Sequence, residues 1–312
     1  MGMRLVTAIL VAGLAVSFGF SGGHSSCLAE GTAGVAARDS ARTEPRAAHV
    51  ASIKCIDPDT GDRFAPLGVA FGLAGDLYVV DGDNSSVFVI SGESGEPAFF
   101  AACPGSSDCQ FVDIVSDAGA FYVSDRAQGT VTVIDSNGRV VAQRQVGSGV
   151  GGIGLGVAGQ VYAAMTLEGS VVIADLYGDN SPVVCPVFDS TDGSYPVDCL
   201  LGKSNRVLVS DALSRKVLVL SVLGKRLGSL VGFEFKSPFG LARLDDRWLL
   251  VSDSELGLVA VFDSDGKFAG TIGQGSLETP TFMDMRDDGT LAVADAGTMT
   301  IEVFRFGDPA SK

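Results

Sequence analysis

The chain repeats Leu77-Tyr78-Val79-Val80-Asp81, an apolar run ending in an acid, as Phe121-Tyr122-Val123-Ser124-Asp125 and Leu249-Leu250-Val251-Ser252-Asp253. Runs ending at Met165, Asp211 and Asp295 complete a set of six, and successive ends lie 40 to 46 positions apart. A second apolar run begins six positions after each end, at Val87, Val131, Val171, Val217, Val259 and Ile301. A fixed offset inside a variable period indicates one supersecondary unit copied six times.

Each unit is predicted to form four strands. A short segment such as Pro66-Leu67-Gly68-Val69-Ala70 precedes the paired runs, and a turn such as Asp135-Ser136-Asn137-Gly138-Arg139 follows them. Val, Ile, Phe and Tyr favour strands, and Asn-Gly or Asp-Gly favours tight hairpins. Six such units predict an all-β fold, a six-bladed β-propeller with four-stranded antiparallel blades.

The two ends of the repeat region are expected to meet in the last blade. The sixth unit has only three strands, and a β-like stretch without a unit, Val50-Ala51-Ser52-Ile53-Lys54-Cys55, precedes the first unit. We expect this N-terminal strand to close the last blade and remove its open edge. The propeller is placed at residues 49–308, behind a flexible leader at 30–48.

Residues 1–29 have the pattern of a secretory signal peptide. Arg4 precedes an uncharged run from Leu5 to Phe20, and Cys27-Leu28-Ala29 is a small-residue cleavage site. The run is shorter than the ~20 residues that span a membrane, so we expect cleavage and a secreted or periplasmic protein without a membrane span. A retained anchor and a lipid anchor at Cys27 are alternatives, although the segment before Cys27 lacks the leucine expected of a lipoprotein signal.

Five cysteines remain after signal removal. Cys103 and Cys109 bracket one short connection and Cys185 and Cys199 another, so in an oxidising compartment both pairs are expected to form local disulfides. Cys55 is left over. Free thiols and metal ligation are the alternatives, and metal is disfavoured because the chain has no C-x-x-C motif and His49 is its only histidine beyond the signal.

The charge balance disfavours anionic partners. The chain carries 37 acidic and 22 basic residues, a net charge of −15, and no Lys/Arg cluster. Nucleic acids and anionic membrane surfaces are therefore not expected partners. A neutral or cationic partner is favoured, although negative charge also keeps a secreted protein soluble.

Two sets of acids stand at repeated positions. Asp81, Asp125, Asp211, Asp253 and Asp295 end the first runs, where each is expected to accept N–H bonds from the turn that follows; a functional carboxylate ring is the alternative. Met165 breaks the rule, so its turn is expected to differ. Asp113, Asp198 and Asp284 stand in the innermost strands of alternate units. They are expected to tie each blade to its neighbour or, alternatively, to hold a metal ion such as calcium in approximate three-fold symmetry.

The units resemble NHL repeats. The likeness lies in Pro-x-Gly-[Val/Leu]-Ala, [Leu/Phe]-Tyr-Val-x-Asp, Val-x-Val-[Ile/Phe]-Asp and Gly-[Lys/Arg], and covers about residues 50 to 306. The resemblance implies a six-bladed propeller but no single function, since such propellers bind RNA or protein, act as sensors, or in a few cases are lyases. The lyases use zinc held by several histidines, which this chain lacks. Lactonases with related folds use Glu, Asn and Asp around a divalent ion.

These observations favour an exported binding platform that does not catalyse a reaction. The expected partner is a protein or peptide of the cell envelope. Its contact face would carry the turns between the second and third strands, with Asp83, Asn84, Arg126, Glu168, Arg215 and Glu255. The alternative is a divalent-metal-dependent hydrolase, lactonase or lyase that uses the carboxylates at the channel mouth.

Overall fold

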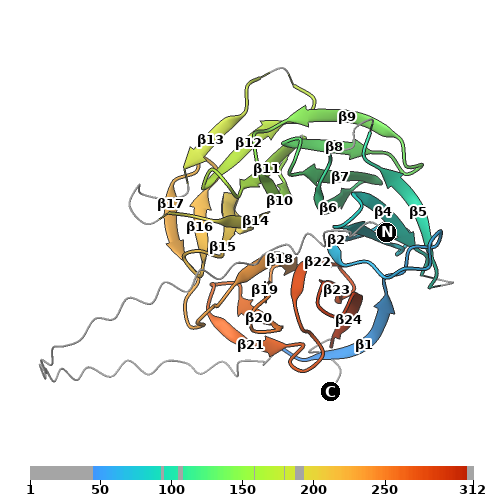
Figure 1. Cartoon of the computed structure of the whole chain (residues 1–312). Coiled ribbons are helices and arrows are strands. Elements are labelled where there is room, and N and C mark those ends of the chain that lie inside the picture. Colours follow the sequence, from blue (N-terminus) through green and yellow to red (C-terminus); the bar gives the residue numbers. More distant parts are fainter. Residues whose placement is uncertain are drawn as a thin grey trace, which may run out of the picture. The chain divides into compact units, whose positions relative to one another are not determined.

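A computed structural model shows six four-stranded antiparallel sheets arranged as the blades of a ring (Figure 1). It describes residues 45–92, 95–104, 108–157, 159–178, 180–186 and 193–307. The expected signal peptide, Cys27 and nearly all of the leader lie outside the described residues. Among these residues, no helix has the length and apolar character needed to cross a membrane.

The first three blades each run from an innermost to an outermost strand in chain order. Blade one holds β2 (Pro66–Phe71), β3 (Leu77–Asp81), β4 (Ser86–Ile90) and β5 (Pro97–Ala102). Blade two holds β6 (Phe111–Asp117), β7 (Ala120–Asp125), β8 (Thr130–Ile134) and β9 (Val140–Gln145). Blade three holds β10 (Val150–Leu155), β11 (Gln160–Met165), β12 (Ser170–Asp175) and β13 (Val183–Pro186).

The remaining blades follow the same plan, except that blade six takes its outermost strand from the other end of the repeat region. Blade four holds β14 (Pro196–Leu201), β15 (Arg206–Asp211), β16 (Lys216–Ser221) and β17 (Arg226–Ser229), with a short 3-10 turn, η1 (Lys203–Asn205). Blade five holds β18 (Pro238–Leu244), β19 (Trp248–Asp253), β20 (Leu258–Asp263) and β21 (Phe268–Ile272). Blade six holds β22 (Pro280–Met285), β23 (Thr290–Asp295), β24 (Thr300–Phe306) and β1 (Ala47–Lys54).

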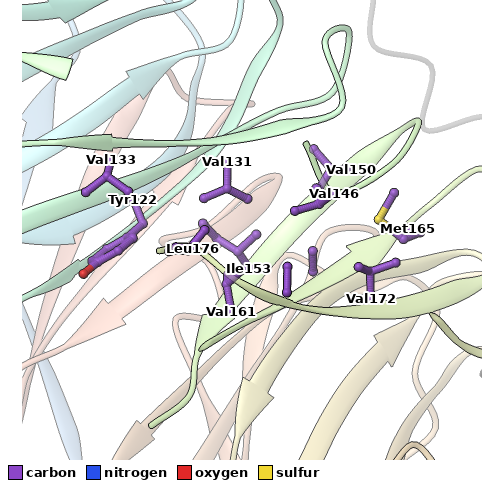
Figure 2. Close-up of a cluster of buried hydrophobic side chains, with 12 residues drawn as sticks. Tyr122, Val131, Val133, Val146, Val150, Ile153, Val161, Met165, Val172 and Leu176 are labelled. Atoms are coloured by element: carbon purple, nitrogen blue, oxygen red, sulfur yellow. The ribbon is translucent and has the colours of Figure 1, made fainter. Parts of the chain in front are cut away.

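The core is divided into separate apolar layers, one in each gap between neighbouring blades. Figure 2 shows the layer between blades two and three, where Tyr122, Val131 and Val133 face Ile153 and Val161. The other five gaps hold corresponding clusters. Because both faces of each sheet are covered, the strands are apolar on both sides, which explains their nearly continuous hydrophobic runs.

The expected closure of the ring is confirmed. β1 pairs with β24 in antiparallel register from Ala47–Phe306 to Lys54–Thr300. The strand begins at Ala47, so the leader boundary expected at residue 48 was placed slightly too late. The two ends of the repeat region are thus joined in one blade by backbone hydrogen bonds.

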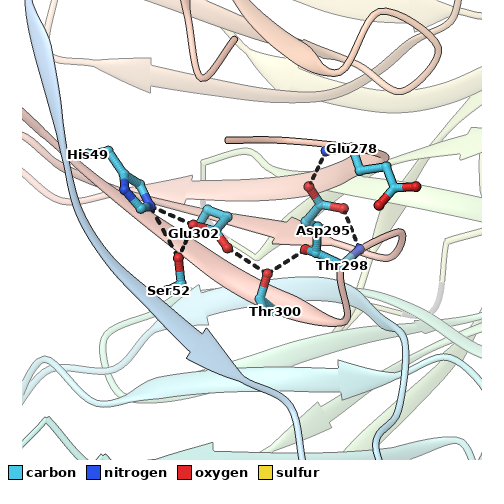
Figure 3. Close-up of polar contacts among 7 residues, drawn as sticks. All are labelled: His49, Ser52, Glu278, Asp295, Thr298, Thr300 and Glu302. Atoms are coloured by element: carbon cyan, nitrogen blue, oxygen red, sulfur yellow. Dashed lines mark hydrogen bonds and ion pairs between the residues drawn. The ribbon is translucent and has the colours of Figure 1, made fainter. Parts of the chain in front are cut away.

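A buried glutamate fastens this closing strand. Glu302 of β24 is 3% exposed, and its Oε2 lies 2.5 Å from Nε2 of His49 and accepts a 2.6 Å bond from the hydroxyl of Ser52, both on β1 (Figure 3). Its Oε1 accepts a 2.7 Å bond from Thr300. His49 therefore stabilises the pairing of β1 with β24 at the outer edge of blade six. A zinc ligand would be needed at the ring axis, and His49 lies away from it.

One of the two expected disulfides forms. Cys103 and Cys109 are joined between β5 and β6. Cys185 and Cys199 are separate buried thiols, so the second disulfide was predicted wrongly. Cys185 lies in the outermost strand of blade three and Cys199 in the innermost strand of blade four, where its thiol donates to the Tyr162 carbonyl. Burial raises the pKa of both thiols and that of Cys55, which reaches about 12.

Removing the closing strand is expected to destabilise the whole ring. A chain that starts at Cys55 loses β1 and leaves the buried Glu302 without its partners on that strand. We expect the free energy of unfolding to fall by at least about 3 kcal/mol, roughly 10 °C in melting temperature. The matched control starts at Pro45 and retains β1. Equal melting temperatures for the two chains, measured by calorimetry, would show that closure contributes nothing.

Candidate functional site

The turns between the second and third strands of the blades all lie on one side of the ring. This side, called the turn face below, carries residues 82–85, 126–129, 166–169, 212–215, 254–257 and 296–299. Every run-ending aspartate is fully buried beneath it. Each aspartate lies beneath its turn because antiparallel pairing places the end of each second strand next to the start of the third strand.

The five buried aspartates hold the turns closed, which confirms their expected structural role. Asp295 Oδ1 accepts N–H bonds from Gly297 at 3.0 Å and Thr298 at 3.1 Å, and its Oδ2 accepts one from Glu278 at 2.7 Å in the loop before β22. Asp253 bonds its own turn and the loop before β18 in the same way. Each of the five carboxylates accepts backbone N–H bonds, and Asp81 also accepts one from the Asn84 side chain, so these acids do not form an open carboxylate ring.

Blade three shows what happens without the carboxylate. Its backbone turn is the same as in other blades, since the Gly169 N–H still bonds the Met165 carbonyl at 2.9 Å; the expectation of a different turn was wrong. The side chains differ instead. The hydroxyls of Thr166 and Ser170 are buried and have no hydrogen-bond partner among the described residues.

The turn face also exposes apolar side chains that the sequence analysis missed. Leu167 is 73% exposed, Leu213 58%, Leu256 38% and Met299 37%, one from each of blades three to six. Tyr195, which directly precedes β14, is 40% exposed on the same face. Their signal was present in the sequence, because a large apolar residue in a polar turn is unusual.

The residues expected to make contact share this face. Asp83, Asn84, Glu168, Arg215 and Glu255 are exposed, whereas Arg126 is half-buried. Burial lowers the pKa of Arg126, although the charge of Tyr195 opposes that effect. The face therefore combines charges of both signs with an apolar arc over four consecutive blades.

Three of these turns contain a residue in an unfavourable backbone conformation. The last residue of each turn adopts a left-handed conformation, and it is glycine in blades two, three and five. In the other blades it is Ser85, Arg215 and Met299, with φ of 52°, 56° and 56°. Left-handed non-glycine residues cost about 1 kcal/mol or more each, so these side chains are present despite a cost to stability.

Aspartates in the innermost strands have a second structural role: they link neighbouring blades. Asp113 of blade two accepts the N–H of Ile153 in blade three at 3.0 Å, and Asp198 of blade four accepts that of Leu241 in blade five at 2.8 Å. The other oxygen of each accepts the N–H of the next residue in its own strand. The expected inter-blade tie is therefore present.

The expected three-fold symmetry of these acids is wrong. Strand pairing aligns Ile114 with Val123 and Met283 with Val293, so Phe282, rather than Asp284, occupies the position of Asp113. Asp284 stands two residues further along its strand. It still bridges two blades, through a 2.8 Å bond from the Phe71 N–H of blade one.

Apolar side chains fill the axis next to these acids. Val112, Val197 and Phe282 are buried together, and the Phe239 ring meets that of Phe282 edge-on at 5.0 Å. Within the described part of the chain, one group of three possible metal ligands has its ligand atoms within 4.8 Å of one another: Cys103, Cys109 and Asp125. The two sulfurs of this group already form a disulfide. Calcium binding at Asp113, Asp198 and Asp284 stays a prediction, since the structure does not bring their oxygens that close.

Burial strongly perturbs the inner acids. It raises the pKa of Asp113 to about 7 and that of Asp284 to about 6, against the effect of their N–H donors. For Asp198, burial and then the charge of Asp113 raise the pKa well above its usual value. The folded protein therefore keeps protons at pH values where the unfolded chain, with aspartate near 3.9, has released them.

The cost of replacing Asp113 is therefore expected to depend on pH. Stabilisation by protonated Asp113 is present at low pH and is lost as the pH rises from about 4 to about 7. The loss of unfolding free energy in Asp113→Asn, measured by urea denaturation, should thus shrink over this range. Asp135→Asn is the control: backbone hydrogen bonds lower the pKa of this exposed acid, so its cost should stay constant from about pH 4 to about pH 7 and shrink only below about pH 4. A cost of Asp113→Asn that stays constant or grows over this range would contradict the assignment.

Comparisons with known proteins support the fold. No protein-family model and no curated protein sequence matches the chain. Among solved structures, a streptogramin B lyase is similar with a TM-score of 0.63 and 13% identity, covering 86% of this chain and 99% of the other. A protein of unknown function from Bacteroides thetaiotaomicron gives 0.68 and 13%, covering 85% and 77%. A chain of a mitotic checkpoint complex gives 0.60 and 10%, covering 93% and 99%. At these identities the likeness concerns the β-propeller fold alone.

Proposed function

We propose that this chain is an exported NHL-type propeller that holds a protein or peptide partner on its turn face without catalysing a reaction. The observation that carries the proposal is the exposed arc of Leu167, Leu213, Leu256 and Met299 on four consecutive blades. Large apolar side chains exposed on one face among polar groups are a feature of interaction sites. Glu168, Arg215 and Glu255 stand in the same turns and provide a charged rim.

The strained turn residues support the same face. Arg215 and Met299 project from positions where glycine would relieve strain. Backbone strain tends to be retained where a side chain serves function. Ser85, the third such residue, is buried. Arg215 and Met299 are therefore the two strained side chains that can contact a partner.

The alternative, a divalent-metal-dependent hydrolase, lactonase or lyase, has weaker support. Two similar structures are streptogramin or virginiamycin B lyases, the latter from Staphylococcus aureus with quinupristin. However, His49 lies at the outer seam, and apolar side chains fill the axis beside Asp113 and Asp198. Turnover that is lost with EDTA would favour the enzyme, whereas partner binding that survives EDTA favours the platform.

The compartment is part of the proposal. The Cys103–Cys109 disulfide fits an oxidising location outside the cytoplasm. It also shapes the turn face, because Gln128 in the turn of blade two donates to the Cys109 sulfur at 3.1 Å. A partner in the cell envelope is therefore the one we expect.

Charge placed in the apolar arc should weaken partner binding. The protein would be used to capture partners from the envelope, and the retained protein would be identified and purified. We expect Leu213→Asp to weaken its binding at least tenfold, about 1.4 kcal/mol, because it places a charge in an apolar contact. Leu223→Asp is the matched control: Leu223 is 85% exposed in blade four, but in the turn on the opposite face. Equal effects of the two changes, measured by calorimetry, would refute use of the turn face.

Replacing the strained turn residues with glycine should raise the stability of the fold and weaken partner binding. Arg215→Gly and Met299→Gly are expected to raise the free energy of unfolding by about 1 kcal/mol each, since glycine adopts the left-handed conformation freely. The same changes should weaken partner binding. Ala118→Gly is the control, because Ala118 has φ of 48° in a turn of the opposite face. It should stabilise the fold and leave binding unchanged. If the two turn-face variants bind as tightly as the parent, their side chains do not contact the partner.

A further inference from the structure

A groove of about 560 Å³ opens between blades four and five, on the side of the ring opposite the turn face. The turn between β14 and β15 and the turn between β20 and β21 border it. Its volume lies within the range of small-ligand sites. None of the residues expected to bind a partner or a metal lines this groove.

The groove lies beside a position where blade four lacks the tyrosine of the first three blades. Blades five and six also lack it and have Leu250 and Ala292 there. Tyr78, Tyr122 and Tyr162 occupy the second position of the apolar run in blades one to three, and each fills the gap toward the next blade. Blade four has Leu208 at this position, as the equivalent pairs Tyr162–Ile173 and Leu208–Val219 show. The missing ring leaves an apolar floor of Leu208, Val219, Leu230 and Leu249.

An outer-strand glycine widens the groove further. Gly228 of β17 lines it, and a Cβ atom at this position would meet nothing within 4 Å. Its backbone does not adopt the positive φ that favours glycine. Neither packing nor backbone conformation therefore requires glycine here. Glycine within a strand weakens it and often marks a place where a ligand or another backbone approaches closely.

Two arginines reach this groove from opposite walls. Arg206 begins β15 of blade four and Arg243 lies in β18 of blade five. Neither guanidinium group makes a hydrogen bond or ion pair with any described residue. Four aspartates also line the groove. Asp245 pairs with Arg247 at 3.0 Å, Asp263 accepts the N–H groups of Asp265 and Lys267, and Asp246 is also engaged. The charged side chains of the lining without a described partner are therefore Arg206, Arg243 and Asp265, two positive charges against one negative charge.

We propose that this groove binds a short apolar peptide by its free C-terminal carboxylate, which Arg206 and Arg243 hold between the two blades. Guanidinium groups match a carboxylate in geometry and charge. The apolar side chains of the peptide lie on the floor around Leu208, and its backbone passes over Gly228. Capture of a C-terminal carboxylate is a recurrent form of peptide recognition. The site is separate from the turn face, so either can fail without the other.

The sole tryptophan of the chain provides the measurement. Trp248 lines the groove, so titration with the tripeptide Ala-Leu-Leu should change its fluorescence, with a dissociation constant below about 1 mM. Calorimetry would confirm the value. The C-terminal amide of the same peptide should bind at least about tenfold more weakly, because a charged hydrogen-bond partner is removed. Decanoate, which has a carboxylate but no peptide backbone, tests whether any amphiphilic acid suffices.

Three variants test the residues. Arg243→Gln should weaken the tripeptide about tenfold, whereas Arg139→Gln, at an exposed position of the turn between β8 and β9 in blade two, should change affinity less than twofold. Leu208→Tyr restores the residue found in blades one to three and should abolish binding while keeping the melting temperature.

The proposal is overturned if the parent protein binds no tripeptide at 1 mM, or if the amide binds as well as the acid. Equal effects of Arg243→Gln and Arg139→Gln also contradict it. If decanoate binds as tightly as the tripeptide, the groove recognises an amphiphilic acid and the peptide assignment is wrong. The ligand and arginine comparisons remain decisive if Leu208→Tyr does not fold.

Discussion

Each blade of this protein has two apolar faces and can cover neither of them alone. The six inter-blade layers provide that cover, and every layer depends on the ring being closed. The pairing of β1 with β24 is therefore the contact on which the others rest, since it completes the blade that joins the first unit to the last. Glu302 strengthens this seam with a buried carboxylate whose partners lie on both strands.

Aspartate performs two different structural tasks, and its position in the blade decides which. At the end of a second strand, Asp253 faces its own turn and the loop before its own blade, so it stabilises one hairpin. In an innermost strand, Asp113 faces the backbone of the next blade and links two sheets. In both places the carboxylate oxygens accept backbone N–H groups. The acids that looked most like catalytic or metal-binding groups are thus used by the scaffold, which leaves the exposed turns and the groove for recognition.

The fold could be predicted from the sequence because period, offset and the three-strand last unit are properties of the chain itself. Details that depend on the spacing between blades could not. Cys185 and Cys199 are close in sequence, but the connection between them crosses from the outside of one blade to the axis side of the next. Asp284 was expected at the position of Asp113, but it stands four residues after the start of its innermost strand, whereas Asp113 stands two residues after the start of its own. Left-handed residues such as Met299 carry no sequence signal that separates them from ordinary turn residues.

The turn carboxylates also explain how this face can vary. In four of the five blades that have the aspartate, N–H bonds come both from the turn and from the loop before the blade, so the turn is held from two sides. Among the blades with the aspartate, three keep a strained residue at the last position of the turn, Ser85, Arg215 and Met299, whereas blades two and five have glycine there. Blade three lacks the carboxylate and has the unstrained Gly169 at that position. A buried acid that performs no chemistry thus allows the chain to place chemically useful side chains above it, because the stability that each strained side chain costs is offset within the same turn.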